Sequence, residues 1–224
     1  MAARANHPGA AAFVPATSDL AQLRSHASGC RGCDLYGPAT QTVFGSGSDR
    51  ATLMLVAEQP GDVEDIRGEP FVGPAGAVLD RALRDAGLSD VPTWTTNAVK
   101  HFRFTERGKR RIHEKPTAAQ STACRPWLAA ELAAVRPAVL VALGATAAAS
   151  LYGPGFRLTA ARGAPVAWPP AKGSFAATDV ELRAAFATLH PSAILRAPDD
   201  ERAAAYDGLV HDLRVVAAAW EGRA

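Results

Sequence analysis

The sequence has 224 residues, of which 48% are hydrophobic and 21% charged, and its net charge is +2. This composition is that of a folded globular protein and argues against an intrinsically disordered chain. The longest apolar stretch, 138–143, is far shorter than the roughly 18 residues of a membrane-spanning helix. The first residues also lack the apolar core of a secretory signal. We therefore expect a cytoplasmic protein without membrane contact, with a flexible arm over 1–16 and one domain over 17–224.

The predicted elements alternate between helices and strands along the chain. Apolar spacing and flanking Gly or Pro residues predict helices over 17–28, 73–86, 116–135 and 200–220, and a short helix after Gly144. Thr17 or Ser18 is expected to cap the first helix. Apolar runs predict strands over 52–57, 93–97, 138–143 and 184–189, and the segment 162–173 is expected to be a loop with an edge-strand contact. We expect a single three-layer α/β/α domain whose central, mostly parallel sheet has about four strands.

Polar side chains follow three of these predicted strands. Glu58 and Gln59 come directly after the first strand, Asn97 ends the second, and His190 follows the last. In parallel sheets the ligand crevice lies at the carboxyl ends of the strands. These side chains are therefore expected to meet in one functional site.

Positive charge is concentrated in one segment. Seven of the 24 Lys and Arg residues lie between Lys100 and Lys115, where only Glu106 and Glu114 oppose them. The segment thus carries a net charge of +5, and the rest of the chain −3. A local basic patch on a nearly neutral protein suits phosphate contact, whereas a solvated loop is the structural alternative.

The cysteines suggest a metal site. The chain has three, Cys30, Cys33 and Cys124, an odd number that does not suit a disulfide framework. A C-x-x-C pair with a distant third cysteine indicates a metal or cluster site that lacks one ligand. Three buried cysteines without a ligand are the alternative.

Four segments resemble motifs of the uracil-DNA glycosylase superfamily, and they follow one another along the chain in the order that the family has. Residues 58–62, E-Q-P-G-D, resemble its first catalytic motif, and residues 190–192, H-P-S, its second. Residues 71–76, F-V-G-P-A-G, and 96–100, T-N-A-V-K, are similar to the base-stacking and base-recognition segments of the iron–sulfur members, commonly called family 4. The resemblance extends from Cys30 to the last predicted helix.

One departure from family 4 indicates a subfamily. His101 stands where ordinary family 4 enzymes have their third cysteine ligand, and Cys124 corresponds to the fourth ligand. The interval between them is longer than usual and contains G-K-R-R-I-H at 108–113. Both features resemble the UdgX-type enzymes, in which the K-R-R-I-H loop is diagnostic and the protein becomes covalently attached to DNA.

The resemblance implies a [4Fe-4S] cluster with a structural role, held by Cys30, Cys33, His101 and Cys124. Imidazole nitrogen is an accepted replacement for thiolate on iron. A zinc ion would accept the same four donors. His101 could instead face a phosphate within the basic segment. No nucleotide cofactor is expected.

The resemblance also implies how uracil is bound once the base has left the stack. Phe71 would form the aromatic floor, and the Asn97 amide would pair with the N3–H and O4 of uracil while refusing cytosine. Gln59, through nearby backbone N–H groups, and Ser192 would complete the uracil site. Burial of Phe71 in the core and a turn role for Asn97 are the structural alternatives.

The chemistry would fall to two histidines and two carboxylates. His190 would stabilise the uracil anion, and His113 would attack C1′ of the sugar. Glu58 would orient or deprotonate His113, or stabilise the sugar cation, with Asp62 as a helper. A loop position for His190 and a phosphate contact for His113 are the alternatives.

The expected partner is uracil-containing DNA, with single strands accepted, bound by a monomeric protein. Lys109, Arg110 and Arg111 would order the loop or contact phosphates. Three other functions remain open: an ordinary turnover family 4 glycosylase, a non-enzymatic iron–sulfur redox module, and a DNA-binding protein without chemistry.

Overall fold

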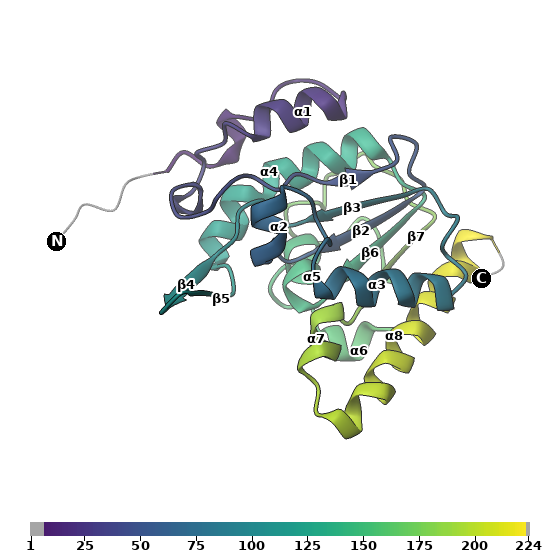
Figure 1. Cartoon of the computed structure of the whole chain (residues 1–224). Coiled ribbons are helices and arrows are strands. Elements are labelled where there is room, and N and C mark those ends of the chain that lie inside the picture. Colours follow the sequence, from purple (N-terminus) through teal and green to yellow (C-terminus); the bar gives the residue numbers. More distant parts are fainter. Residues whose placement is uncertain (1–6, 223–224) are drawn as a thin grey trace.

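A five-stranded sheet forms the centre of the structure, a computed structural model that describes residues 7–222 (Figure 1). In sheet order the strands are β1 (Ser46–Gly47), β3 (Thr93–Asn97), β2 (Leu53–Ala57), β6 (Val139–Leu143) and β7 (Ala184–Thr188). The last four are parallel, and β1 pairs antiparallel with β3. The predicted parallel sheet is confirmed and gains a fifth strand, whose two residues are too few to form a sequence pattern.

Helices cover both faces of this sheet, which confirms the three-layer architecture. On one face the core includes α1, α4 and α5, and on the other α3, α7 and α8 (Figure 1). The helices are α1 (Leu20–Ala27), α2 (Asp62–Arg67), α3 (Pro74–Asp85), α4 (Ala118–Val135), α5 (Ala145–Tyr152), α6 (Leu158–Ala161), α7 (Pro191–Arg196) and α8 (Asp199–Trp220), with 3₁₀ turns η1 (Ala10–Ala12) and η2 (Asp34–Tyr36). Among the described residues, no helix is long and apolar enough to cross a membrane.

The apolar run of β2 shows why the sheet is buried on both sides. Leu53 and Leu55 belong to the core on the α3 and α8 face, whereas Met54 and Val56 belong to the core on the α1, α4 and α5 face. Successive side chains of a strand point to opposite faces, so a strand covered twice must be apolar throughout. The core therefore fixes β2 from both sides, up to the residue before Glu58.

Two local details differ from the sequence prediction or refine it. The first helix is capped by Asp19, not by Thr17 or Ser18, because the Asp19 carboxylate accepts hydrogen bonds from the backbone N–H groups of Ala21 and Gln22. In the segment 162–173, Val166 forms one antiparallel bridge with Ala185 of β7, which is the expected edge contact.

The basic segment forms an antiparallel hairpin where the sequence suggested a loop. Strands β4 (Phe104–Arg107) and β5 (Arg110–His113) pair from Phe104 with His113 to Arg107 with Arg110. Gly108 opens the two-residue turn with a φ of 62°, as a type II′ turn requires of its first central residue. Figure 1 shows that the hairpin projects away from the sheet. Its register places His113 at the base of the hairpin.

The N-terminal segment contacts the cysteine turn. The expected flexible arm covers 1–16, and residues 1–6 lie outside the described residues. Beyond them, the Gly9 N–H donates to the Gly32 carbonyl at 3.0 Å, and Ala10 is buried. A Cβ on Gly32 would lie 2.6 Å from the Ala10 nitrogen, so a side chain at this position would force the two segments apart.

The start of α3 offers a test of how closely this fold holds Phe71. A Cβ on Gly76 would lie 1.6 Å from the Phe71 carbonyl oxygen. We expect Gly76→Ala to lower the free energy of unfolding by about 1–3 kcal/mol, as overpacking does elsewhere. Urea denaturation measures this loss. Gly155→Ala is the matched control because nothing lies within 4 Å of its added Cβ. Equal midpoints for the two variants would contradict the tight packing described.

Candidate active site

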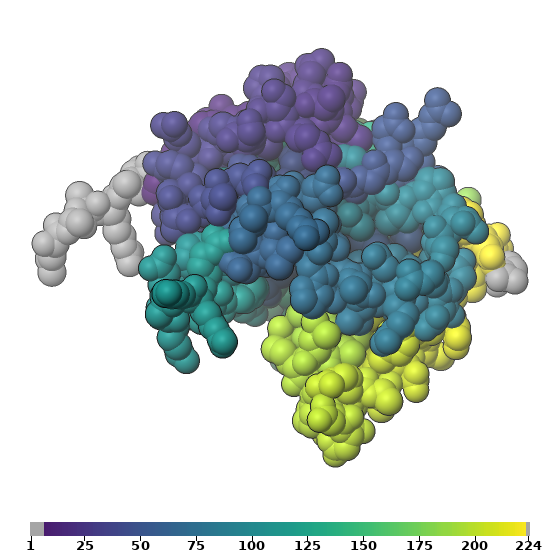
Figure 2. Space-filling view, in the orientation of Figure 1, coloured from purple at the N-terminus to yellow at the C-terminus, as the bar shows by residue number. Residues whose placement is uncertain are grey.

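The carboxyl ends of β2, β3 and β7 bring the polar residues predicted after these strands to one edge of the sheet. Ala57 pairs with Asn97 in the parallel ladder, and Glu58 follows Ala57. The ladder continues beyond the strands, because the Val99 N–H donates to the Glu58 carbonyl at 3.0 Å. His190 comes two residues after the end of β7. Figure 2 shows the surface hollowed between the hairpin and α7, which flank this edge.

Phe71 lies against His190. Their ring centroids are 6.1 Å apart and the ring planes differ by 24°. Phe71 has a φ of 60°, a left-handed conformation that is strained for a bulky residue and is concentrated at functional sites. The partly buried Phe71 ring thus forms one wall beside the imidazole.

Ser192 fixes the tautomer of His190. The Ser192 backbone N–H donates to His190 Nδ1 at 3.1 Å, and the Ser192 hydroxyl lies 2.7 Å from the same nitrogen. Burial, together with the charges of Arg196 and His113, lowers the pKa of His190 to about 4. The ring is therefore neutral near pH 7, and its proton is on Nε2. His190 can donate one hydrogen bond from Nε2 into the site.

The Asn97 side chain is available to a ligand. The residue is only 3% exposed, yet its amide forms no hydrogen bond with another described residue. Nearly buried amides are normally paired. An amide offers one acceptor and two donors, so a ligand with complementary groups would complete its hydrogen bonding.

His113 faces Glu58 across the site. Its Nε2 lies 3.4 Å from Glu58 Oε1, and the two side chains are 49% and 21% exposed. The imidazole also lies beside the Phe102 ring, with centroids 6.1 Å apart. The structure thus brings together a histidine and a carboxylate that are 55 positions apart in the chain.

Gln59 holds the base of the hairpin. Its side-chain oxygen accepts from the Arg103 N–H at 3.1 Å, and its side-chain nitrogen donates to the carbonyls of Arg103 and Glu114, each at 3.1 Å. The Gln59 amide is therefore fully engaged with backbone. Only the backbone N–H groups near Gln59 remain to serve the predicted uracil contact.

Arg111 anchors the hairpin to α2. Its guanidinium donates to Asp62 Oδ1 and to Asp65 Oδ2, each at 2.6 Å. It also lies over the Phe102 and Phe104 rings, 5.5 and 5.0 Å from their centroids. The structure thus pairs Asp62, predicted as a helper in the chemistry, with the hairpin. Asp65, which is fully buried, was not found from the sequence, because its partner is 46 positions away.

The hairpin tip is free to meet a ligand. Lys109 and Arg110 are exposed, and their side chains form no ion pair with any residue between 7 and 222. Exposed cations near a site are suited to phosphate contact.

The three cysteines lie together in the core. Cys30, Cys33 and Cys124 are free thiols, each less than 10% exposed, in one apolar cluster. Burial raises the pKa of Cys124 to about 12, and the neighbouring Cys33 and Cys30 add to the rise. Within the described part of the chain, no three His, Cys, Asp or Glu side chains converge tightly enough to hold a single metal ion. A cluster differs in this respect, since its cysteines bind separate irons.

The contacts of His101 leave one ring nitrogen free to bind a metal. The Thr42 hydroxyl donates to the Ala27 carbonyl at 2.9 Å, so it can only accept from His101 Nε2, which lies 2.9 Å away. The proton is therefore on Nε2, and Nδ1 keeps a free lone pair. The preceding residue, Lys100, donates its backbone N–H to Cys124 Sγ at 3.2 Å. These observations fit a site of three thiolates and one imidazole.

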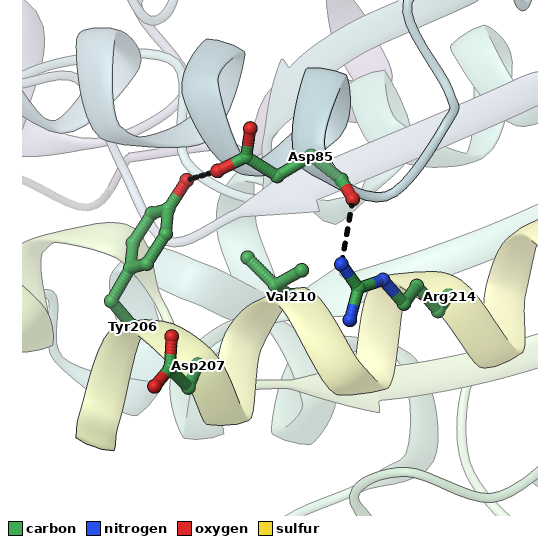
Figure 3. Close-up of a pocket in the computed structure, with 5 residues that line it drawn as sticks. All are labelled: Asp85, Tyr206, Asp207, Val210 and Arg214. Atoms are coloured by element: carbon green, nitrogen blue, oxygen red, sulfur yellow. Dashed lines mark hydrogen bonds between the residues drawn. The ribbon is translucent and has the colours of Figure 1, made fainter. Parts of the chain in front are cut away.

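A separate cavity lies between α3 and α8. It has a volume of about 270 Å³ and is lined by Asp85 together with four residues of α8 (Figure 3). The Tyr206 hydroxyl donates to Asp85 Oδ2 at 2.5 Å, and Arg214 donates to the Asp85 carbonyl at 3.1 Å. None of the predicted site residues lines this cavity. Tyr206 and Arg214 are both paired with Asp85, and the cavity is separate from the sheet edge, so it adds nothing to the site.

Comparison with known proteins finds one family and relatives of one kind. The profile of the Uracil DNA glycosylase superfamily matches residues 44–214. A Type-4 uracil-DNA glycosylase of Thermotoga maritima is 33% identical over 173 residues, which cover 77% of this chain and 81% of that relative. One from Pyrobaculum aerophilum is 32% identical over 183 residues, 80% and 86% of the two chains. One from Archaeoglobus fulgidus is 37% identical over 123 residues, 55% of this chain and 58% of the relative.

The surroundings of His190 predict how it titrates. Because its pKa is lowered from 6.5 to about 4, protonation opposes folding, and the associated stability is present above pH 6.5 and is lost as the pH falls through 4. Nitrogen-15 NMR of labelled histidines should show a neutral ring protonated on Nε2 at neutral pH. The resonance is assigned by its loss in His190→Gln. A titration midpoint near 6.5 would contradict the buried environment.

Proposed function

This chain belongs to the uracil DNA glycosylase superfamily, and on that premise we propose that it excises uracil from DNA and then bonds through His113 to C1′ of the deoxyribose. The observation that carries the second step is the 3.4 Å approach of His113 Nε2 to Glu58 Oε1. A nucleophile within reach of a base is the arrangement that covalent catalysis requires.

Uracil recognition would fall to Phe71 and Asn97. A flipped base would lie against the partly buried Phe71 ring, which already packs beside His190. The Asn97 amide oxygen would accept from uracil N3–H, and its amide nitrogen would donate to O4. Cytosine presents the opposite pattern and would leave buried polar groups unpaired. The unpaired Asn97 side chain supports this assignment.

His190 would assist bond cleavage as a neutral donor. When the C1′–N1 bond breaks, its electron pair leaves with uracil, and a positive charge develops on the sugar. The Nε2–H of His190 would donate to uracil O2, where negative charge gathers. A pKa of about 4 keeps the ring neutral, and the Ser192 contacts keep the proton on Nε2.

His113 would then capture the sugar. Glu58 would take the Nε2 proton, the Nε2 lone pair would form a bond to C1′, and the departing uracil would gain a proton. The overall reaction replaces the C1′–N1 bond to uracil with a C1′–Nε2 bond to His113, so it needs no oxidant or reductant. The product lacks a good leaving group, so the adduct should persist.

The four predicted ligands would hold a [4Fe-4S] cluster in the cysteine core. Cys30, Cys33 and Cys124 would supply thiolates, and His101 would supply Nδ1, since Nε2 is engaged with Thr42. When bound, the cluster would join the N-terminal turn to α4 and to the segment after β3. Zinc with the same donors is the alternative.

The DNA would cross the sheet edge next to the hairpin. Lys109 and Arg110 at its tip would contact phosphates, whereas Arg111 would order the hairpin through α2. Single-stranded DNA would be accepted by a monomeric protein. The turnover alternative also has support, since the 49% exposed His113 side chain leaves the site open to water.

Replacement of His113 separates the two fates of the DNA. Incubation of the protein with uracil-containing single-stranded DNA should give a shifted band that survives heat and detergent on a denaturing gel. His113→Ser should abolish this band and release uracil with an abasic site, because water replaces the imidazole. His211→Ser, at an exposed position of α8, is the matched control and should retain the band. Uracil release by the unsubstituted protein without a shifted band would leave only the turnover function.

The metal content can be measured independently of activity. Protein purified without oxygen should contain about four irons per chain and show the broad visible absorption of an iron–sulfur cluster. Cys124→Ser should lose both, because it removes a buried ligand. One zinc per chain, or no metal at all, would count against the cluster.

A separate activity measurement distinguishes the enzyme from a redox module or a simple DNA-binding protein. The enzyme should release uracil from uracil-containing DNA and should release no base from normal DNA, whereas the two alternatives should release neither.

A further inference from the structure

A buried ion pair between Lys100 and Glu131 contacts the backbone of Asn97 and has no part in the proposed chemistry. Lys100, three residues after the end of β3, and Glu131 of α4 are both 0% exposed. Taking two charges out of water costs several kcal/mol for each ion, and apolar residues of similar size are often as stable. Stability alone is therefore a weak explanation for this pair.

Lys100 uses all three of its donors in this cluster. Its ammonium donates to Glu131 Oε2, to Thr96 Oγ1 at 2.7 Å and to the Asn97 carbonyl at 2.7 Å. An ammonium has three protons, so none is left for another partner. The pair thus holds the backbone of the residue whose side chain faces the site.

Glu131 ties the same strand to its neighbours. Its Oε1 accepts from the Gly45 N–H at 2.9 Å, the Trp94 indole at 3.3 Å and the Thr96 hydroxyl at 2.9 Å. Both carboxylate oxygens are therefore satisfied. The network spans α4, β3 and the segment before β1, and it fixes the end of β3 from the side opposite β2.

The Asn97 peptide is consequently held on two sides. Its carbonyl accepts from Lys100, and the next N–H, that of Ala98, donates to the Ala57 carbonyl at 2.8 Å. The Asn97 side chain has no hydrogen bond of its own within residues 7–222. The direction of its amide therefore depends on the backbone, and the backbone depends on Lys100 and Glu131.

We infer that Lys100 and Glu131 are positioning residues that aim the Asn97 amide at the uracil edge and thereby set the preference for uracil over cytosine. This inference rests on the proposed function, in which Asn97 recognises uracil. Small displacements of such groups are costly, since a misplacement of about 1 Å can reduce a rate by about a hundredfold.

The test replaces both charges together. Removal of one partner would leave an unpaired buried charge and endanger the fold. Lys100→Met combined with Glu131→Leu instead replaces the ion pair with apolar side chains of similar volume. We expect this double variant to lose thermal stability, because the Gly45 N–H, the Trp94 indole and the Thr96 hydroxyl lose their acceptor. It should nevertheless fold and keep its iron content, because the Lys100 backbone N–H to Cys124 remains. Its affinity for free uracil should fall about tenfold, and its single-turnover ratio of uracil to cytosine excision should fall with it.

A cycle with Asn97→Ala separates positioning from a general structural effect. In the Asn97→Ala background the same double replacement should cost no further uracil affinity, because the group that it positions is absent. An equal loss in both backgrounds, or unchanged affinity in the double variant, would overturn the inference. If the double variant fails to fold, Lys100→Gln combined with Glu131→Gln is measured instead, because it keeps polar groups at both positions without an unpaired buried charge. Unchanged affinity and selectivity would again overturn the inference.

The unsubstituted protein distinguishes this failure from that of the proposed function. Release of uracil by the unsubstituted protein, together with unchanged affinity in the double variant, would overturn the positioning role alone. Absence of both uracil binding and uracil release in the unsubstituted protein would overturn the proposed function and the positioning role together.

Discussion

The hydrogen bonds between β2 and β3 continue past the ends of the strands, and the rest of the site depends on this continuation. Ala98 and Val99 donate to the carbonyls of Ala57 and Glu58, so the segments that follow the two strands stay paired. The separation of Glu58 and Asn97 is therefore set by the backbone. Because β2 is packed on both faces, neither segment can shift without disturbing the core.

The hairpin is held by side chains, and its anchors come from the same short segment as Glu58. Gln59 binds the base of the hairpin. Asp62 and Asp65, in the helix α2 that follows, bind Arg111. One stretch of eight residues, 58–65, thus carries the carboxylate and fixes the strand that bears His113. This arrangement limits how far the distance between Glu58 and His113 can vary.

The sequence predicted what depends on local pattern and missed what depends on distant pairs. The four parallel strands and the long helices follow from apolar runs and flanking Gly or Pro residues, and the meeting of Glu58, Asn97 and His190 follows from the strand ends. The hairpin was missed because its charged side chains conceal the alternation of a strand, although Gly108 and Lys109 form a two-residue turn. The engagement of Gln59 and the Arg111 pairs span more than 40 positions, which no local pattern reveals.

The two histidines of the site differ because their surroundings differ, and the proposed function gives them different roles for this reason. His190 is buried against Phe71 and held by Ser192, which makes it a neutral donor with its proton fixed on Nε2. His113 is half exposed beside a carboxylate, where a nucleophile needs an acceptor for its proton. The charge of His113 also contributes to the low pKa of His190, so the two rings interact electrostatically. In the proposed reaction His190 would therefore serve as the hydrogen-bond donor to uracil and His113 as the nucleophile, a division of roles that follows from their two environments.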